Sequence, residues 1–487
     1  MASLGKSGVD STGETMSLRP RQQKAVEDLT AAYKRGFRAP VLIAPTGFGK
    51  THASATIIRR ALAKGKRVWF IAHLKEILNA TSQKLDDEGI PHGWIAAGRD
   101  GNHRLPVQVA MVQTLVRRLD RYQPPDLIIV DEAHLAVANT YQQIFEWAGA
   151  GPKFKRPGGA HLLHLTATPC RLDGRGMNEV ADILVPTCTT QDLIDEGLLA
   201  PIRYYAPSEP DLSGVHTSMG DFNQGELAAA MDKPVITGSA VQHYRKLADG
   251  RPAVAFCVTV EHATNVAEQF KQAGYRAVAI SGESDTVERD AALQGLRDGV
   301  LDVVCNCALW VAGVDAPSIG CIIQLAPTQS VVKYLQSVGR GLRTHPGKDD
   351  CIILDHAGNV KRHGLPTDPR EWTLAAVEKR KNSKKSEVPV KTCPVCFATV
   401  PSIVTDCACG HHFEPVGREI EEVDGELQEI TAAAAKAQAV KERKMEQGRS
   451  QTEADLIRIG RARGMKRPEL WARHVLRARA AKEAQKR

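Results

Sequence analysis

The sequence has no hydrophobic run that is long enough to cross a membrane. Its first residues, MASLGKSGVDSTGETMSLRP, also lack the apolar core that a signal peptide needs. A membrane-spanning helix takes about 20 mostly apolar residues, and no later stretch provides them. We therefore expect a cytoplasmic protein with no membrane partner.

The sequence also lacks the cysteine pattern of a disulfide-bonded secreted protein. Most of its 11 cysteines fall singly among apolar residues, where a small buried side chain is the ordinary role. The exceptions are Cys393, Cys396, Cys407 and Cys409, which lie within one short segment. This distribution favours a reducing compartment and a single metal site.

Acidic residues are scarce only near the C-terminus. Residues 431–487 hold 16 Lys and Arg against 6 Asp and Glu, although the net charge of the whole chain is only +8. The rest of the chain is therefore close to neutral. Such a local surplus is typical of a segment that binds a polyanion, and a solvated helix is the alternative.

Short apolar runs alternate with longer helical stretches in two successive series. The first runs from PVLIA to LLHLT, and the second, from PAVAFC to DCIILD, follows a stretch rich in Pro, Gly and Ser. Apolar runs of this length are typical of buried parallel strands. We therefore predict two tandem α/β domains, each a doubly wound parallel sheet.

The segment APTGFGKT follows the strand PVLIA and precedes a helical stretch. This context is typical of a phosphate-binding loop, in which backbone N–H groups and a helix N-terminus hold phosphates. Thr46, Gly47 and Gly49 would form the loop, Lys50 would reach the outer phosphates, and Thr51 would hold Mg²⁺. We therefore predict a nucleotide and Mg²⁺ as cofactors.

The segment DLIIVDEAH ends a buried strand in two carboxylates, Asp131 and Glu132. Ligands of open α/β sheets bind at this carboxyl edge of the strands. Asp131 would hold Mg²⁺, and Glu132 would orient and deprotonate the attacking water. An acidic pair that caps a helix is the alternative, but it would not require the preceding strand.

A third motif, LTATP, completes an order that resembles the superfamily 2 helicases: nucleotide loop, Asp-Glu-Ala-His (DEAH) box, then Thr-Ala-Thr. The resemblance covers about residues 18–365, and the stretches VEHA, SVGRGLR and ILDHAGNVKRHG are most similar to the RadD-like and XPB-like DNA helicases. It implies two RecA-like motor domains that move on nucleic acid while they hydrolyse ATP.

The resemblance also implies binding residues outside these motifs. Gln22 in LRPRQQ would contact the adenine. Gly313 and Asp315 in CALWVAGVDAP would belong to the family's fifth motif, although Ala312 departs from its usual polar residue. Because of this departure, the resemblance says less about how this segment couples ATP hydrolysis to movement than about the other residues.

The second domain contributes the pattern Gln-x-x-Gly-Arg-x-x-Arg. In the resembling family it faces nucleotide bound to the first domain, so Gln336, Arg340 and Arg343 would complete the catalytic site. An arginine finger of this kind contributes roughly 10³ to 10⁵ in rate. A solvated pair of charges is the alternative.

The segment CPVCFATVPSIVTDCACGHHF carries the clustered cysteines as a Cys-x-x-Cys pair and a Cys-x-Cys pair. Four thiolates suit a tetrahedral structural Zn²⁺, and so short a segment hardly folds without one. The second pair is one residue tighter than usual, so His411 or His412 is an alternative ligand for one thiol. Unmetallated surface cysteines are the other alternative.

These patterns divide the chain into consecutive regions. The predicted regions are a disordered N-terminus (1–17), an ATP-binding RecA-like domain (18–204), a connecting segment (205–232), a second RecA-like domain (233–365), a charged linker (366–391), a zinc ribbon (392–414), a helical linker (415–448) and a basic helical module (449–487).

Together the motifs predict an ATP-dependent DNA helicase or translocase, with recombination, repair or replication proteins as candidate partners. An RNA helicase is the nearest alternative, because the same motor fold acts on either polymer. An ATP-gated clamp or annealing factor is the alternative from another class, but Glu132, Arg340 and Arg343 are all present. No nuclease, protease or methyltransferase motif is evident.

Overall fold

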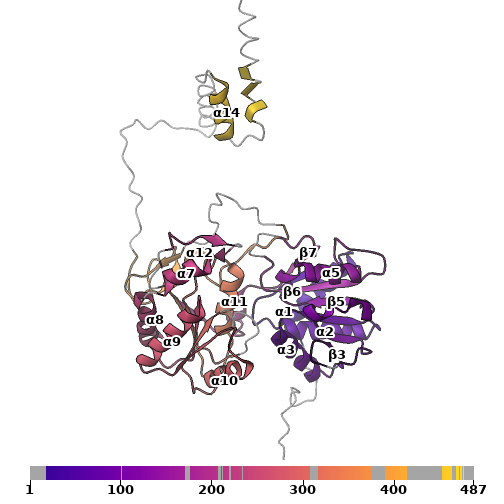
Figure 1. Cartoon of the computed structure of the whole chain (residues 1–487), viewed down its shortest axis with the longest axis horizontal. Coiled ribbons are helices and arrows are strands. Elements are labelled where there is room, and N and C mark those ends of the chain that lie inside the picture. Colours follow the sequence, from indigo (N-terminus) through magenta and orange to yellow (C-terminus); the bar gives the residue numbers. More distant parts are fainter. Residues whose placement is uncertain are drawn as a thin grey trace, which may run out of the picture. The chain divides into compact units, whose positions relative to one another are not determined.

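The computed structural model of the chain consists of two units, residues 1–414 and residues 415–487, and each is described by itself. The residues that the structure describes are 18–99, 101–170, 176–206, 210, 212–218, 221–232, 234–307, 316–375, 390–413, 452–462, 468–470, 472, 473, 475 and 476. The first unit contains two parallel-sheet domains, here named lobe 1 (residues 18–200) and lobe 2 (residues 201–365) (Figure 1).

Lobe 1 is built on a seven-stranded sheet in which all neighbouring strands are parallel, in the order β3-β4-β2-β5-β6-β1-β7. The strands are β1 (Pro40–Ile43), β2 (Val68–Ala72), β3 (Gly93–Ile95), β4 (Val107–Met111), β5 (Leu127–Val130), β6 (His161–Thr166) and β7 (Ile183–Pro186). The helices are α1 (Pro20–Lys34), α2 (Lys50–Leu62), α3 (Lys75–Asp87), α4 (Val112–Leu115), α5 (Asn139–Ala148) and α6 (Thr190–Asp195), with short 3₁₀ helices η1 (Leu119–Arg121) and η2 (Ala133–Leu135).

Both faces of this sheet are covered by helices. Phe70 and Ile129 belong to an apolar cluster with residues of α1, α2 and α3, whereas Ile71 and Ile128 belong to a second cluster with residues of α4 and α5. Because side chains alternate between the faces of a strand, both faces require apolar residues. This explains the continuous apolar runs in the sequence.

Lobe 2 is built on a six-stranded sheet, also parallel throughout, in the order β12-β13-β11-β14-β15-β8. The strands are β8 (Ile202–Tyr205), β11 (Ala253–Cys257), β12 (Ala277–Ile280), β13 (Val303–Cys307), β14 (Cys321–Gln324) and β15 (Cys351–Asp355). The helices of the lobe and of the connecting region are α7 (Gln224–Met231), α8 (Pro234–Leu247), α9 (Val260–Gln272), α10 (Thr286–Arg297), α11 (Val331–Gly341) and α12 (Asn359–His363).

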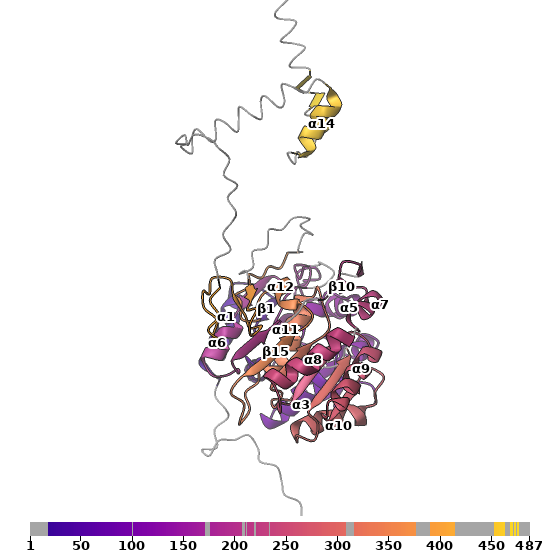
Figure 2. The same cartoon turned by 90° about the vertical axis from the view of Figure 1, so that its left-hand side faces the viewer.

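The second sheet is also buried on both faces. Helices α8 and α9 lie together on one face (Figure 2), where Tyr244 and Phe270 pack with Ala255. Leu296 of α10 and Val338 of α11 belong to the cluster on the other face. Two tandem RecA-like doubly wound domains were predicted from the sequence, and this topology confirms them.

Two small antiparallel hairpins are attached to lobe 2. The first, formed by β9 (Thr217–Ser218) and β10 (Asp221–Phe222), lies in the segment that follows β8. The second, formed by β16 (Val390–Thr392) and β17 (Thr399–Pro401), carries the first two clustered cysteines between its strands. Its Phe397 carbonyl accepts a hydrogen bond from Ala206 N at 3.1 Å, so this hairpin covers the end of edge strand β8.

The second unit contains helix α14 (Glu453–Ala462), on which Leu456 packs with Ala472 and Val475. Much of the predicted basic module, all of the helical linker (415–448) and all of the N-terminus (1–17) lie outside the described residues. Within the part of the chain that the structure describes, none of the helices has both the length and the apolar character needed to cross a membrane.

Candidate nucleotide site and metal centre

The predicted phosphate-binding loop leaves β1 and enters α2 at Lys50. Gly47 and Gly49 have φ angles of 88° and 89°, a backbone region that is open to glycine and strained for other residues. Gly49 is the N-cap residue of α2, so the loop ends at the positive end of a helix dipole. Such a backbone fits the phosphates of a nucleotide.

Two side chains hold this loop in place. Lys50 Nζ donates to Ala44 O at 3.0 Å, and Gln22 Nε2 donates to Phe48 O at 2.8 Å. Gln22 Oε1 also accepts from Arg19 N at 3.0 Å, which fixes the amide in the first turn of α1. Gln22 therefore lies against the loop, and its contact with adenine stays a prediction.

Asp131 and Glu132 follow β5 at the carboxyl edge of the sheet. Glu132 has a φ of 48°, and its N–H donates to Asp131 Oδ1 at 2.9 Å. Burial and the charge of Glu132 raise the pKa of Asp131 to about 6, whereas Lys50 and Arg340 act in the opposite direction. A buried carboxylate whose ionisation is opposed in this way fits a divalent cation, so Asp131 suits Mg²⁺.

The LTATP motif forms a tight turn at the end of β6. Thr166 Oγ1 donates to Thr168 O at 3.0 Å and accepts from Thr168 N at 3.1 Å. The carbonyl of Thr166 accepts from Ala44 N at 2.9 Å. The turn is therefore tied directly to the first residue of the phosphate-binding loop.

Helix α11 brings residues of lobe 2 to this site (Figure 1). Gln336 Nε2 donates to Glu132 Oε2 at 3.0 Å, and the charge of Arg340 acts on Asp131. The helix approaches closely because Gly339 has no side chain: a Cβ there would lie 3.0 Å from Thr46 Oγ1. The structure thus brings both predicted residues of α11 to the carboxylates of lobe 1.

Arg343 lies just beyond the end of α11. Its backbone forms an isolated antiparallel bridge with Leu199, and its carbonyl accepts from Lys348 Nζ at 2.8 Å. The structure therefore places Arg343 where the chain crosses between the lobes. Its predicted role as an arginine finger stays a prediction.

The sequence placed the end of the first domain near this crossing, at residue 204, but not the contacts that the crossing makes. Ala200 N donates to Leu342 O at 2.7 Å, and Leu199 is 2% exposed. A Cβ at Gly47 would collide with the Leu199 side chain, so this leucine packs on the phosphate-binding loop. A single leucine near a proline gives no sequence signal for such a contact.

A second crossing was also missed, within the region predicted as a charged linker. Trp372 and Leu374 pack against the lobe 1 cluster that contains Phe145, and Leu374 O accepts from Asn178 N at 3.1 Å. Trp372 also lines a cavity of about 300 Å³ between the lobes, together with Thr46 and other residues. The only sequence signal was an aromatic residue in an otherwise polar stretch.

The fifth motif cannot be placed in this arrangement. Gly313 and Asp315 lie outside the described residues, and so does Ala312. Their predicted role in nucleotide binding stays a prediction.

The four clustered cysteines converge beside the β16–β17 hairpin, with all four Sγ atoms within 4.8 Å of one another. Two of the Sγ separations are 3.7 Å, between Cys393 and Cys409, and 3.5 Å, between Cys396 and Cys407. A tetrahedral Zn²⁺ with Zn–S bonds of about 2.3 Å requires separations of about 3.8 Å, so the four thiols fit this ion.

The histidines proposed as alternative ligands have other contacts. His412 Nδ1 donates to Asp406 Oδ1 at 2.7 Å, and the His411 ring packs edge-on against Phe413. Neither histidine belongs to the cluster of candidate metal ligands among the described residues. The arrangement favours four thiol ligands.

Two protein families match the chain. Type III restriction enzyme, res subunit, matches residues 15–171, and Helicase conserved C-terminal domain matches residues 238–345. The first match falls on lobe 1 and the second on lobe 2.

Relatives match over most of this chain. A 51.5 kDa protein of a Lactococcus phage is 31% identical over 82% of this chain and 84% of its own length. A Saccharomyces cerevisiae protein with the provisional name ATP-dependent helicase IRC3 is 29% identical over 70% of this chain, which spans only 51% of that protein. The type I restriction enzyme EcoKI endonuclease subunit of Escherichia coli is 22% identical over 68% of this chain and 33% of its own length.

Solved structures share the fold. A fragment of a provisionally named HsdR subunit of a type I restriction enzyme from Vibrio vulnificus has a TM-score of 0.56 at 22% identity, and the match covers 72% of this chain and 66% of that chain. The ATP-dependent type ISP restriction-modification enzyme LlaBIII, solved bound to DNA, has a TM-score of 0.50 at 17% identity over 70% of this chain and 28% of its own. With a family match on each lobe and both RecA-like lobes in place, the chain belongs to the superfamily 2 helicases.

Proposed function

We propose that the chain is an ATP-driven DNA translocase or helicase. The observation that carries the proposal is the hydrogen bond across the lobes, from Gln336 to Glu132 at 3.0 Å. Because the candidate catalytic base contacts the other lobe, hydrolysis depends on how the lobes are arranged. This dependence is what couples chemistry to movement in a motor.

Residues of lobe 1 would bind the nucleotide and activate water. The loop amides and Lys50 would hold the phosphates, and Thr51 and Asp131 would hold Mg²⁺, which would supply positive charge to neutralise the phosphoryl oxygens. Glu132 orients the attacking water and accepts its proton.

Residues of lobe 2 would complete the site. Gln336 holds Glu132, and Arg340 and Arg343 stabilise the charge that develops on the transferred phosphoryl group. Such arginines contribute roughly 10³ to 10⁵ in rate, or about 4 to 7 kcal/mol of transition-state stabilisation. Gly313 and Asp315 remain proposed members of the same site.

Similarity to restriction enzymes supports DNA as the polymer. The EcoKI and EcoAI endonuclease subunits align over 68% and 70% of this chain, and LlaBIII was solved bound to DNA. The pre-mRNA-splicing ATP-dependent RNA helicase prp-28 of Neurospora crassa aligns over only 28% of this chain. RNA is therefore the second candidate substrate.

The proposal includes a structural Zn²⁺ and partner proteins. The support for Zn²⁺ is the spacing of the four thiols, which would hold the ion beside the edge of lobe 2. The support for partners is that the restriction relatives are named as subunits. Proteins of recombination, repair or replication are the partners that we propose.

ATP hydrolysis in the presence of duplex DNA, single-stranded DNA and RNA of equal length tests the choice of polymer. We expect DNA to stimulate hydrolysis and RNA to have little effect, with Lys50→Ala as a control that removes all three rates. Stimulation by RNA alone would turn the proposal into an RNA helicase. A rate that no polymer raises would count against a motor.

A further inference from the structure

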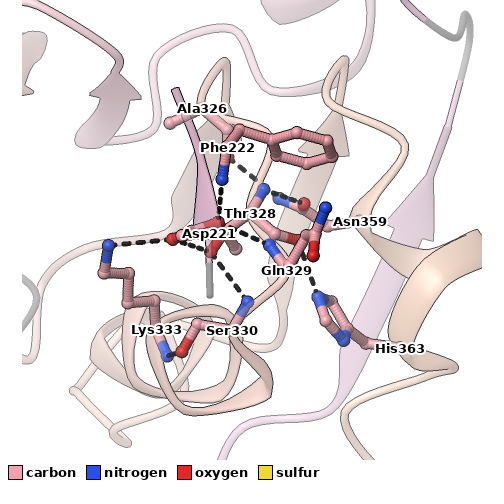
Figure 3. A network of polar contacts seen from close by, with 9 residues as sticks. All are labelled: Asp221, Phe222, Ala326, Thr328, Gln329, Ser330, Lys333, Asn359 and His363. Carbon is pink, nitrogen blue, oxygen red and sulfur yellow. Dashed lines mark hydrogen bonds and ion pairs between the residues drawn. The ribbon is translucent and has the colours of Figure 1, made fainter. Parts of the chain in front are cut away.

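Two different segments contact helix α11, one near each of its ends. At the C-terminal end, Ala200 N donates to Leu342 O at 2.7 Å. At the N-terminal end, the β9–β10 hairpin contacts residues 328–333 (Figure 3). Because α11 carries Gln336 and Arg340, the crossing at Ala200 and the hairpin are both attached to the helix that would complete the ATP site.

The hairpin reaches α11 through the carboxylate of Asp221 (Figure 3). Oδ1 accepts from Gln329 N at 2.7 Å, whereas Oδ2 accepts from Thr328 Oγ1 at 2.9 Å and from Lys333 Nζ at 2.9 Å. Lys333 lies in the first turn of α11, and the other two partners immediately precede its N-cap residue, Ser330. One carboxylate thus binds the loop backbone, a loop side chain and the helix.

The surroundings of Asp221 favour its ionised form. The side chain is 17% exposed, and burial alone would raise its pKa. The hydrogen bond from Gln329 N and the ammonium of Lys333 outweigh burial, so the pKa lies below its ordinary value. Hydrogen bonds to an ionised acceptor are stronger than those between neutral groups.

The loop before α11 also has contacts that do not involve Asp221. Thr328 N donates to Asn359 Oδ1 at 3.0 Å, and His363 Nε2 donates to Thr328 O at 2.9 Å. Lys333 N donates to the N-cap oxygen, Ser330 Oγ, at 3.1 Å. We therefore expect lobe 2 to fold without the Asp221 carboxylate.

We propose that Asp221 is a positioning residue for ATP hydrolysis, because it fixes the N-terminal end of α11 to the β9–β10 hairpin of lobe 2 and so aligns Gln336 and Arg340 with the carboxylates of lobe 1. This inference rests on the proposed function of the chain. Asp221 acts through α11 rather than through a contact of its own with the reacting atoms. A merely structural role would lower stability and leave the turnover of folded chains unchanged.

The test is the full chain with Asp221→Ala, and with Asp221→Asn as the variant that keeps side-chain size and one acceptor oxygen. Steady-state ATP hydrolysis is measured at saturating DNA over a range of ATP concentrations. We expect kcat to fall by about tenfold or more in Asp221→Ala, because small misalignments of catalytic groups cost this much. The KM for ATP should change by less than about twofold. The kcat of Asp221→Asn should lie between those of the parent chain and Asp221→Ala.

Asp302→Asn provides a matched control in the same lobe. Asp302 is 22% exposed and accepts hydrogen bonds from Arg276 N at 2.8 Å and from the Arg276 guanidinium. It precedes β13, at the amino edge of the sheet, and its partner is Arg276 instead of α11. We expect its kcat to match the parent chain.

An unchanged kcat in Asp221→Ala would overturn the positioning role, and so would an equal loss in Asp302→Asn. Thermal unfolding of each variant shows whether the chain is folded; if Asp221→Ala is not, the kcat of Asp221→Asn decides. A parent chain that DNA does not stimulate would instead contradict the proposed function, so the two failures are distinguishable.

Discussion

Glu132 is held in a left-handed backbone conformation, with a φ of 48°. Residues in such sparsely populated regions cost of order 1–3 kcal/mol and persist where neighbouring contacts hold them. Here the N–H of Glu132 donates to Asp131, and its carboxylate accepts from Gln336. These contacts fix the direction of the carboxylate, which a general base requires.

Glu132→Gln should separate nucleotide binding from hydrolysis. The glutamine keeps the size and the backbone strain but cannot accept a proton, so we expect single-turnover hydrolysis to slow by about 100-fold or more. Nucleotide affinity should stay within about twofold, whereas Lys50→Ala should lose it. Hydrolysis at the parent rate in Glu132→Gln would show that another group is the base.

His164 should make the stability of lobe 1 depend on pH. Its Nε2–H donates to Val180 O at 2.9 Å, Nδ1 is buried without a partner among the described residues, and burial lowers its pKa from 6.5 to about 4. The unfolded chain therefore takes up a proton that the folded chain does not, and stability is lost as pH falls from about 6.5 to about 4. At pH 4 this one group lowers the free energy of unfolding by about 3 kcal/mol relative to its value above pH 6.5.

Chemical denaturation across this pH range tests the assignment. His164→Gln keeps a donor for Val180 O but does not titrate. Its free energy of unfolding should therefore fall less steeply as pH falls, and the difference in slope should correspond to at most one proton per chain. Identical slopes in the two chains would mean that His164 does not cause the dependence.

At the scale of elements, helix α11 depends on two glycines for different reasons. A Cβ at Gly339 would lie 3.0 Å from Thr46 Oγ1 on the phosphate-binding loop, whereas one at Gly341 would lie 2.5 Å from Cys351 Sγ and 2.8 Å from Ile322 within lobe 2. The first glycine permits contact between the lobes. The second permits packing of the helix on its own sheet.

Gly339→Ala and Gly341→Ala should therefore affect different properties, turnover in the first and stability in the second. Gly339→Ala should lower DNA-stimulated hydrolysis without loss of stability, since alanine favours a helix by about 1 kcal/mol. Gly341→Ala should destabilise the chain by about 1–3 kcal/mol through overpacking. Thermal unfolding and turnover of both variants check this, and a stable Gly341→Ala chain would refute the packing argument.

The cysteine-bearing hairpin should require its metal. We expect about one Zn²⁺ per purified chain by elemental analysis. A Cys393→Ser, Cys396→Ser double variant should lose the ion while nucleotide binding persists, and Cys307→Ser, outside the cluster, should retain it. Full zinc content in the double variant would rule out this site.

The sequence predicted the strands of lobe 1 that lead to the candidate site residues. Lys50 and Asp131 follow apolar strands and Thr166 ends one, so their place at the carboxyl edge of one sheet follows from strand direction alone. Gln336 and Arg340 came from the family resemblance, because nothing local relates α11 to lobe 1. Helix spacing could place them on one face, but not against Glu132.

The β9–β10 hairpin shows why other elements escaped prediction. Asp221 lies in a stretch rich in Pro, Gly and Ser, and its partner Lys333 is 112 residues away in the sequence. Composition predicts a connection in such a stretch, and it carries no information about where the connection docks. Only the folded chain relates the two.

At the scale of the whole molecule, the described chain passes between the lobes twice, near Leu199 and again before Trp372. The apolar cluster of lobe 1 continues through Leu199 to Tyr334 and Val338 of lobe 2. These contacts join residues that are far apart in the sequence, so neither was predicted. We therefore expect that movement of one lobe would be transmitted to the candidate nucleotide site.

The dependence of ATP hydrolysis on DNA length tests the central claim most directly. A translocase that starts at random and moves along DNA hydrolyses more ATP per binding event on longer DNA, so we expect the saturated rate to rise with length and then level off. Gln336→Ala should lower the rate at every length, because the contact with Glu132 is lost. A parent rate that is stimulated by DNA but independent of its length would contradict translocation and indicate a static, ATP-gated clamp.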